Sequence, residues 1–354
     1  MNKILPIEPS PILKAYLNHS FPLGIMEANF GEEILSPLLC HMFISCIYSQ
    51  KDMNQFYIAE TDSWFEKVGA ISHQSLMCKE KDTVCVREAI EEARRRLMNG
   101  EYICSTPNEG KISAVSQGRV YDFDHQCLIY GFNDDEKFYQ SIGYLNSPNR
   151  VYHYIPYKIT YDEYEDALLN VQSGVVELLF YKVNKDFILP SIDLENILKL
   201  FQQYLDSDIP EYTTRDDLRE IIANGELKFG ISAWDELAKY IENIDIGKTI
   251  DMRYVRSYME HKLLMKKRID YLFNHYGIAN SPIVEETSKI YRASQNIMAL
   301  SIKFNLTKNI KLLKKISDKI KLVNYYEIEY LLKTIDCLSF FSEIESIGEE
   351  LDDF

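Results

Sequence analysis

The residues most suited to chemistry lie around a histidine that opens an apolar run. His125 precedes the stretch from Cys127 to Tyr130, which is apolar throughout and lies between turn residues, so it predicts a strand buried on both faces. A turn at 133–136 and a second strand at 137–144 would complete a hairpin. A histidine at the rim of such a core carries a charge that its surroundings can tune across neutral pH, or it simply makes one backbone hydrogen bond. The hairpin alone favours the second role.

Acids and thiols near His125 have both a functional and a structural interpretation. Asp122 and Asp124 could orient the imidazole or could be ordinary loop acids. Cys127 follows His125 by two residues on the predicted strand, so the two side chains point to the same side, and packing in the sheet is the favoured role of this thiol. The seven cysteines are odd in number and show no CxxC spacing, which favours reduced thiols over disulfides or a zinc site.

Motifs for other chemistries are missing from the sequence. It contains no GxGxxG, GxxxxGK[ST], HExxH or GxSxG motif, so it indicates no nucleotide, zinc-protease or serine-hydrolase site, and we expect no cofactor and no metal. Tyrosine is abundant, with 25 residues. Five of them could line a groove for an amphipathic ligand, although half-buried packing is the simpler role: Tyr152, Tyr154, Tyr157, Tyr161 and Tyr164.

The N-terminal elements should position this chemistry. Residues 1–23 contain four prolines and predict an irregular arm. From Met26 or Asn29 to Tyr48 the density of apolar residues predicts one buried central helix. Cys40 would lie three to four turns into that helix, away from the dipole at its start, and is expected to be an inert packing residue.

The following elements predict an α+β unit. A helix should begin near Asp82 or Thr83, either of which can cap it, and end before Gly100. Strands are expected at 102–104 and in the hairpin that follows His125. A strand at 151–159, a helix at 161–169 and a strand at 175–181 would complete the unit.

Beyond about Pro190 the apolar spacing becomes helical. It predicts helices at 192–205, 214–223, 232–243, 251–275, 282–304 and 309–336, and no strand-like alternation returns. We therefore expect an α+β domain at 1–188 and an all-helical domain at 189–354.

The composition is that of an ordinary globular protein. The 354 residues are 46% hydrophobic and 26% charged, and the chain can bury a large core. A net charge of -15 argues against broad nucleic-acid binding, which needs a surplus of Lys and Arg. No uncharged run is long enough to span a bilayer, and the first residues lack the features of a signal peptide, so we expect neither membrane association nor secretion and place the protein in the cytoplasm.

One basic helix stands out in this acidic chain. Between Lys303 and Lys321 there are seven lysines and a single acid, Asp318, whereas nine acids and one lysine follow from Val323 onward. The outward lysines could dock an acidic partner, although a solvated cationic face is the simpler interpretation. They are Lys311, Lys314, Lys315 and Lys319.

The hairpin carries a family resemblance. His125-x-x-Leu128-Ile129-Tyr130-Gly131-Phe132-Asn133-Asp134-Asp135, with Tyr161-Asp162-Glu163-Tyr164 opening a helix, resembles the catalytic-histidine half of papain-like proteins, in particular the family named after the N-terminal domain of butirosin biosynthesis protein H. Trp234-Asp235-Glu236-Leu237, Ile250-Asp251-Met252-Arg253, and His261-Lys262-Leu263-Leu264-Met265 with Arg268 resemble the helical extension of some members. Together these segments cover most of the chain.

The resemblance implies a papain-like domain with a Cys–His–carboxylate triad, which this sequence carries only in part. His125 would be the general base. Met26 takes the place of the nucleophilic cysteine at the start of the first helix, with Glu27 beside it, and Gln140 takes the place of the carboxylate. Backbone N–H groups at the Met26–Glu27 helix start would bind an oxyanion. Glu27 could itself act as a base, although an acid in a first helical turn is more often a dipole partner.

Two functions follow from the resemblance. Family relatives act in specialised metabolism, where they transfer an acyl group from a carrier-protein thioester to an amine, so the first expectation is an amide-forming acyltransferase with a carrier protein and a small amine as partners. The second is a catalytically silent binding or scaffold protein that keeps the cleft, which the missing cysteine favours. A cysteine protease would fail for want of the same thiol.

Overall fold

The chain divides into two compact units. A computed structural model describes residues 1–49, 55–58, 64–78, 82–146, 152–189, 191–209 and 227–352. The first unit comprises 1–32 and 62–188, and the second comprises 33–61 and 189–354. The sequence predicts a single division after residue 188, whereas in the structure the segment 33–61 belongs with the C-terminal half. The helix expected at 214–223 lies outside the described residues.

The first unit is built on a seven-stranded sheet whose neighbouring strands pair antiparallel. The strand order is β4-β9-β5-β6-β7-β8, and β1 pairs with β6. The strands are β1 (Asn2–Ile4), β4 (Ile71–Cys78), β5 (Tyr102–Ser105), β6 (Cys127–Asn133), β7 (Phe138–Asn146), β8 (Tyr152–Thr160) and β9 (Val176–Val183). The predicted hairpin after His125 is β6 and β7, which pair with Leu128 opposite Ile142.

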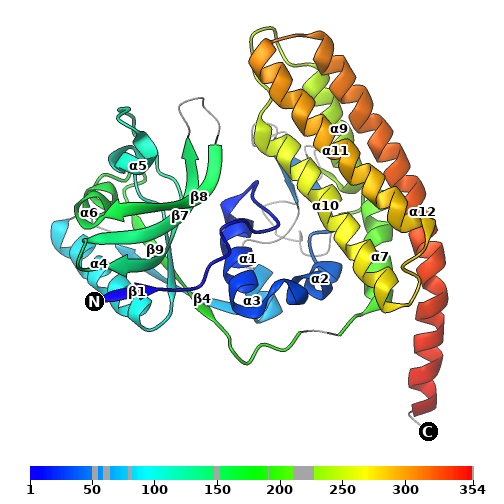
Figure 1. The fold of residues 1–354 in the computed structure, drawn as a ribbon, viewed down its shortest axis with the longest axis horizontal. Helices are drawn as coiled ribbons and strands as arrows, with labels where there is room; N and C mark the ends of the chain where they lie inside the picture. Colours follow the sequence, from blue (N-terminus) through cyan, green and yellow to red (C-terminus); the bar gives the residue numbers. More distant parts are fainter. Residues whose placement is uncertain are drawn as a thin grey trace. The chain divides into compact units, whose positions relative to one another are not determined.

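Helices cover both faces of this sheet (Figure 1). On one side lie α4 (Thr83–Met98) and α6 (Tyr161–Leu169), and on the other lie α1 (Leu17–Phe30) and α3 (Trp64–Val68). The side chains of β5 show which face of the sheet each helix covers, because successive side chains along a strand point to opposite faces. Tyr102 bonds to Asn29 of α1, whereas Ser105 bonds to Tyr164 of α6. Two short turns of helix, η1 (Glu109–Lys111) and α5 (Ser113–Ser116), connect β5 to the loop before β6.

Local signals explain the elements that the sequence predicted best. Asp82 caps α4 by accepting a hydrogen bond from the N–H of Cys85, and Gly100 follows the helix with a φ of 87°. Thr160 and Glu163 form a reciprocal capping box at the start of α6. Both helices therefore begin where the sequence placed them.

The prediction of a single helix from residue 26 or 29 to residue 48 is wrong. α1 already begins at Leu17 and continues through Pro22, and Gly31 ends it with a φ of 88°. A second helix, α2 (Glu32–His41), follows, and the apolar residues after it form the strand β2 (Cys46–Ser49). Apolar spacing alone cannot distinguish a short buried strand from the end of a helix, so the predicted helix extends into the residues that form β2.

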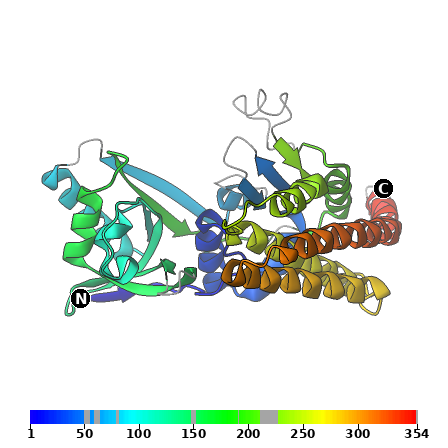
Figure 2. The same ribbon diagram turned by 90° about the horizontal axis from the view of Figure 1, so that it is seen from above.

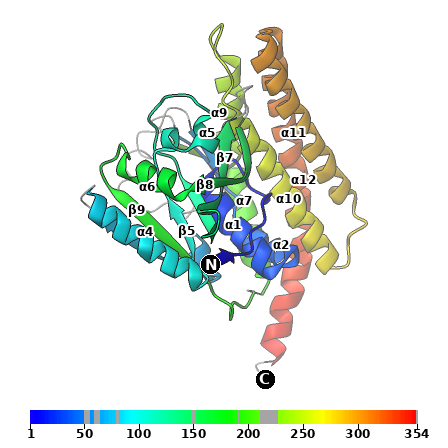
Figure 3. The same cartoon turned by 60° about the vertical axis from the view of Figure 1, so that its left-hand side comes forward.

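The second unit is mainly helical. Its further helices are α7 (Leu194–Asp206), α9 (Gly230–Glu242), α10 (Met252–His275), α11 (Pro282–Thr307) and α12 (Lys311–Asp352). The last three are long and run side by side, as Figure 3 shows. They enclose one apolar core that includes Trp234, Tyr258 and Met265, all fully buried.

A small sheet makes the second unit mixed rather than all-helical. Its order is β10-β2-β3, where β3 is Gln55–Ile58 and β10 is Leu227–Phe229. In Figure 2 the blue β2 and the green β10 lie next to each other although they are far apart in the sequence. Three-residue β10 is too short for an alternation pattern to reveal, so the sequence analysis missed it.

The chain is thus a mixed α/β protein with an antiparallel sheet and a helical C-terminal region. Among the described residues, no helix combines the length and the apolar character that a bilayer-crossing span requires.

Candidate functional site

A histidine–carboxylate pair forms at the point where the sequence placed the catalytic base. His125 lies just before β6, and its backbone N–H donates to the carbonyl of Pro107. Its Nδ1 lies 3.1 Å from Oε2 of Glu109, and 34% of its side chain is exposed. Because a carboxylate only accepts hydrogen bonds, this contact assigns the proton to Nδ1 and leaves Nε2 as the basic nitrogen.

Glu109 is held in place by the turn that carries it. Its other carboxylate oxygen accepts a hydrogen bond from the hydroxyl of Tyr121 at 3.1 Å. Asn108, which is fully buried, accepts from the N–H of Gly110 and donates to Asp122 and to the carbonyl of Asn170. The carboxylate is therefore positioned before any ligand arrives.

Close packing at Gly110 keeps this turn in place. A Cβ atom at Gly110 would lie 1.8 Å from the carbonyl oxygen of Tyr121, so only glycine fits. Glu109 cannot be identified from the sequence, because nothing in the spacing of Glu109 and His125 shows that a turn brings them together.

The two loop acids considered as partners of His125 bind elsewhere. Asp124 accepts hydrogen bonds from the backbone N–H groups of Gln172 and Ser173, and Asp122 accepts from Asn108. Both acids thus attach the loop before β6 to neighbouring segments of the same chain, which is a structural role.

Met26 and Glu27 do not lie at a helix start. α1 begins at Leu17, so both residues lie well inside the helix, and Met26 has no exposed surface. Only the first four N–H groups of a helix are free to bind an anion, since later ones bond to the carbonyl four residues before. The oxyanion-binding corner expected at Met26 and Glu27 is therefore not formed by these residues.

Gln140 does not orient His125. It lies opposite Gly131 on β7, and its side chain bonds to Tyr130. Ser141, the next residue, shares a face with Cys127, which it approaches closely enough to hydrogen-bond, so Gln140 points to the other face. A spacing of fifteen residues places Gln140 on the neighbouring strand but does not make it face the histidine.

α1 and His125 lie on opposite sides of the sheet. The imidazole bonds to Glu109 of η1, which packs against α6, whereas α1 covers the other face through Asn29 and Tyr102. The helix start of α1 is therefore not the element that His125 contacts.

The two thiols considered as alternative nucleophiles, Cys127 and Cys40, are both buried. Cys127 is buried, with its sulfur 3.5 Å from the hydroxyl of Ser105. Burial raises the pKa of the Cys127 thiol, so it stays protonated at neutral pH. Cys40, in α2, is also buried, and its sulfur lies 3.3 Å from the carbonyl of Ser36. Burial raises the pKa of Cys40 to about 12. Neither thiol has the properties of a nucleophile.

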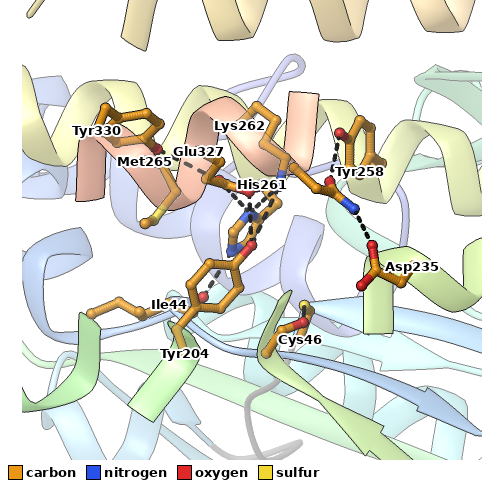
Figure 4. Close-up of polar contacts among 12 residues, drawn as sticks. Ile44, Cys46, Tyr204, Asp235, Tyr258, His261, Lys262, Met265, Glu327 and Tyr330 are labelled. Atoms are coloured by element: carbon orange, nitrogen blue, oxygen red, sulfur yellow. Dashed lines mark hydrogen bonds and ion pairs between the residues drawn. The ribbon is translucent and has the colours of Figure 1, made fainter. Parts of the chain in front are cut away.

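A second polar centre lies in the core of the second unit (Figure 4). The ammonium of Lys262 bonds to Oε2 of Glu327, and neither side chain has any exposed surface. Tyr204 donates to the same carboxylate oxygen at 2.9 Å. The ammonium also lies over aromatic rings, 4.6 Å from the centroid of Tyr258 and 5.3 Å from that of Trp234. Burial lowers the pKa of Lys262, and the adjacent carboxylate opposes that shift.

His261 completes this centre in its neutral form. Its Nε2 lies 2.7 Å from the carbonyl of Ile44, so Nε2 carries the proton, and Nδ1 accepts from Lys262 at 3.4 Å. Burial lowers the pKa of His261 well below its usual range, and the charge of Lys262 lowers it further. The network joins α10 and α12 to the segment before β2 and is closed to ligands, so its role is structural.

The expected lysine face lies along one side of α12. It consists of Lys311, Lys314, Lys315, Asp318, Lys319 and Leu322. Lys314 pairs with Glu242 and Asp318, whereas Lys311, Lys315 and Lys319 form no ion pair with any described residue. This cationic face is open to solvent, and Leu322 adds an apolar side chain to it that is 52% exposed.

No group of three or more His, Cys, Asp or Glu side chains in the described ranges is arranged to hold a metal ion. No protein-family model matches the sequence, and no curated protein is similar enough to match it.

Proposed function

We propose that this chain is a catalytically silent binding protein that holds an acidic carrier protein on the cationic face of α12. The observation that carries the proposal is a set of solvent-open lysines on α12, of which Lys311, Lys315 and Lys319 form no ion pair with the residues that the structure describes, in a chain whose net charge is -15. An acidic recognition helix would complement Lys311, Lys315 and Lys319, and Leu322 would supply an apolar anchor at the edge.

The first unit supports a silent role. A papain-like acyl transfer needs a thiolate beside the histidine, and the two thiols considered for that role are buried in packing positions. Met26 and Gln140 also lack the placement that their proposed roles require. Kinship with the family of the butirosin biosynthesis protein H N-terminal domain remains part of the proposal, and the antiparallel sheet with flanking helices is compatible with it.

The binding proposal is tested by titrating the full chain with a purified, acyl-loaded carrier protein and measuring affinity by calorimetry. A variant with Lys311→Glu and Lys315→Glu should bind at least about tenfold more weakly. The matched control carries Lys182→Glu and Lys185→Glu, two exposed lysines of the first unit, and changes the net charge equally. Equal loss of affinity in both variants, or no binding by the unmodified chain, would contradict the proposal.

A second candidate function rests on the pairing of His125 with Glu109. In this alternative the protein is an amide-forming acyltransferase without an enzyme-bound intermediate. Nε2 of His125 takes a proton from the acceptor amine while the amine nitrogen attacks the thioester carbonyl, the C–S bond breaks, and the imidazolium gives that proton to the departing thiolate. Glu109 would hold the ring and stabilise its cationic form.

Intact mass spectrometry separates the two functions. The chain is incubated with an acyl-loaded carrier protein and a small primary amine, and the amide product and the protein masses are measured. Amide formation that is lost in His125→Ala but kept in Cys127→Ala would establish the acyltransferase. A stable complex without turnover supports the binding protein.

A further inference from the structure

Two cysteines meet at the junction of β4 and α4. Cys78 is the last residue of β4, and Cys85 lies in the first turn of α4. The sulfur of Cys78 lies 3.5 Å from the carbonyl oxygen of Cys85, and the two thiols are within hydrogen-bonding reach of each other. β4 and α4 pack against each other in the same unit, so the pair does not depend on a distant contact.

The local structure holds both thiols in position. Asp82 caps α4 by accepting from the N–H of Cys85 at 2.7 Å, which fixes the turn that carries this thiol. Cys78 pairs in register with Val176 of β9, which fixes the strand end. Each thiol is therefore carried by a regular element of the first unit.

The two thiols differ in access. Cys78 is buried, with 4% of its surface exposed, whereas Cys85 is partly exposed. Burial and then the neighbouring Cys85 raise the pKa of Cys78 to about 12, so its sulfur keeps its proton at neutral pH. Cys85 is therefore the thiol that an oxidant in solution meets first.

The other cysteines do not form such a pair. Cys104 and Cys127 lie on the neighbouring strands β5 and β6, but their side chains belong to opposite faces, since Cys127 is registered with Ser105. Cys40 and Cys46 donate to backbone carbonyls of Ser36 and Gly230.

We propose that Cys78 and Cys85 form a redox site in which a peroxide converts the two thiols to a disulfide that links the end of β4 to the start of α4. The sulfur of Cys85 attacks one peroxide oxygen, the O–O bond breaks, and Cys85 becomes a sulfenic acid while one water leaves. The sulfur of Cys78 then attacks the Cys85 sulfur, the S–O bond breaks, and the proton of Cys78 leaves with the hydroxyl as a second water. Two thiols are oxidised, and one hydrogen peroxide is reduced to two waters.

The test treats the full chain with hydrogen peroxide, blocks the remaining thiols with iodoacetamide, and measures the intact mass and the peptide map. We expect the loss of two hydrogens and a cross-linked peptide containing Cys78 and Cys85, both reversed by dithiothreitol. In the Cys85→Ser variant the intact mass should not show this loss of two hydrogens. In Cys78→Ser the sulfenic acid at Cys85 has no resolving thiol and should be trapped by dimedone.

The control is Cys337→Ser, which removes the other partly exposed cysteine and should leave the cross-link unchanged. A peptide map of the oxidised unmodified chain without the Cys78–Cys85 link would overturn the proposal, and this result does not require that any variant folds. Retention of the two-hydrogen loss in Cys85→Ser would overturn it as well.

Discussion

Lys262 and Glu327 form an ion pair inside the second unit, and neither side chain has exposed surface. Such a pair gains Coulomb energy in a medium of low dielectric but requires the desolvation of both charges, so the intact pair adds little net stability. The loss of one partner is different, because it leaves a buried charge without compensation.

Replacing Lys262 with methionine should therefore destabilise the protein strongly. Lys262→Met retains the volume of the side chain but leaves the Glu327 carboxylate with the Tyr204 and Tyr330 hydroxyls as its hydrogen-bond donors among the described residues. We expect the free energy of unfolding to fall by about 3–5 kcal/mol, measured by urea denaturation. Adding Glu327→Gln removes the buried charge and should recover most of the loss. A double variant that is less stable than the single one would contradict this account.

Acid should destabilise the protein through two buried histidines. Burial lowers the pKa of His19 to about 4 and lowers that of His261 well below its usual range. Unfolded histidine binds a proton below about pH 6.5, but the folded sites do not. The unfolded state therefore binds more protons, and stability falls as pH decreases below 6.5, by about 1.4 kcal/mol per pH unit for each histidine until its folded pKa is reached.

The contribution of His261 can be measured separately. His261→Gln keeps a donor for the carbonyl of Ile44 and an acceptor for Lys262 but does not titrate. In urea denaturation at pH 5, 6 and 7, the second unit of this variant should lose less stability on acidification than that of the unmodified chain. Equal pH dependence of the two proteins would show that His261 is not neutral in the folded state.

The pairing of Glu109 with His125 should depend on Gly110. Gly110→Ala places a Cβ against the carbonyl of Tyr121 and must displace the turn that carries Glu109. We expect the imidazole resonances of His125 to shift in an NMR spectrum, while those of the exposed His153 stay unchanged. Lys111→Ala, at an exposed neighbouring position, is the control and should leave both histidines unaffected.

The sequence predicts elements well where a local signal marks their ends. Asp82 and Gly100 frame α4, and the capping box of Thr160 and Glu163 starts α6. Prediction from the sequence fails where tertiary contacts determine where an element begins or which strands it pairs with. The start of α1 at Leu17 has no side-chain cap, and β2 finds its partners in β10 and β3, so neither could be located from nearby residues.

The candidate site shows the same limit. His125 is recognisable in the sequence from its place before an apolar strand, which is a local feature. Glu109 is not, because its contact with His125 depends on the turn that Asn108 organises. The spacing of Gln140 suggests a partner of His125, but the alternation of side chains along β7 turns Gln140 to the other face.

The end of α2 should depend on the guanidinium of Arg268. This fully buried side chain donates from two nitrogens to the carbonyls of Leu39 and Met42. Carbonyls at the C-terminal end of a helix have no N–H partner within the helix. Lysine has a single nitrogen and cannot match this geometry, so Arg268→Lys should lower the free energy of unfolding by about 2–3 kcal/mol and speed hydrogen exchange in α2. Arg253→Lys, at an exposed ion pair with Asp251, should cost less than about 1 kcal/mol. If both variants lose the same stability, the capping role of Arg268 is wrong.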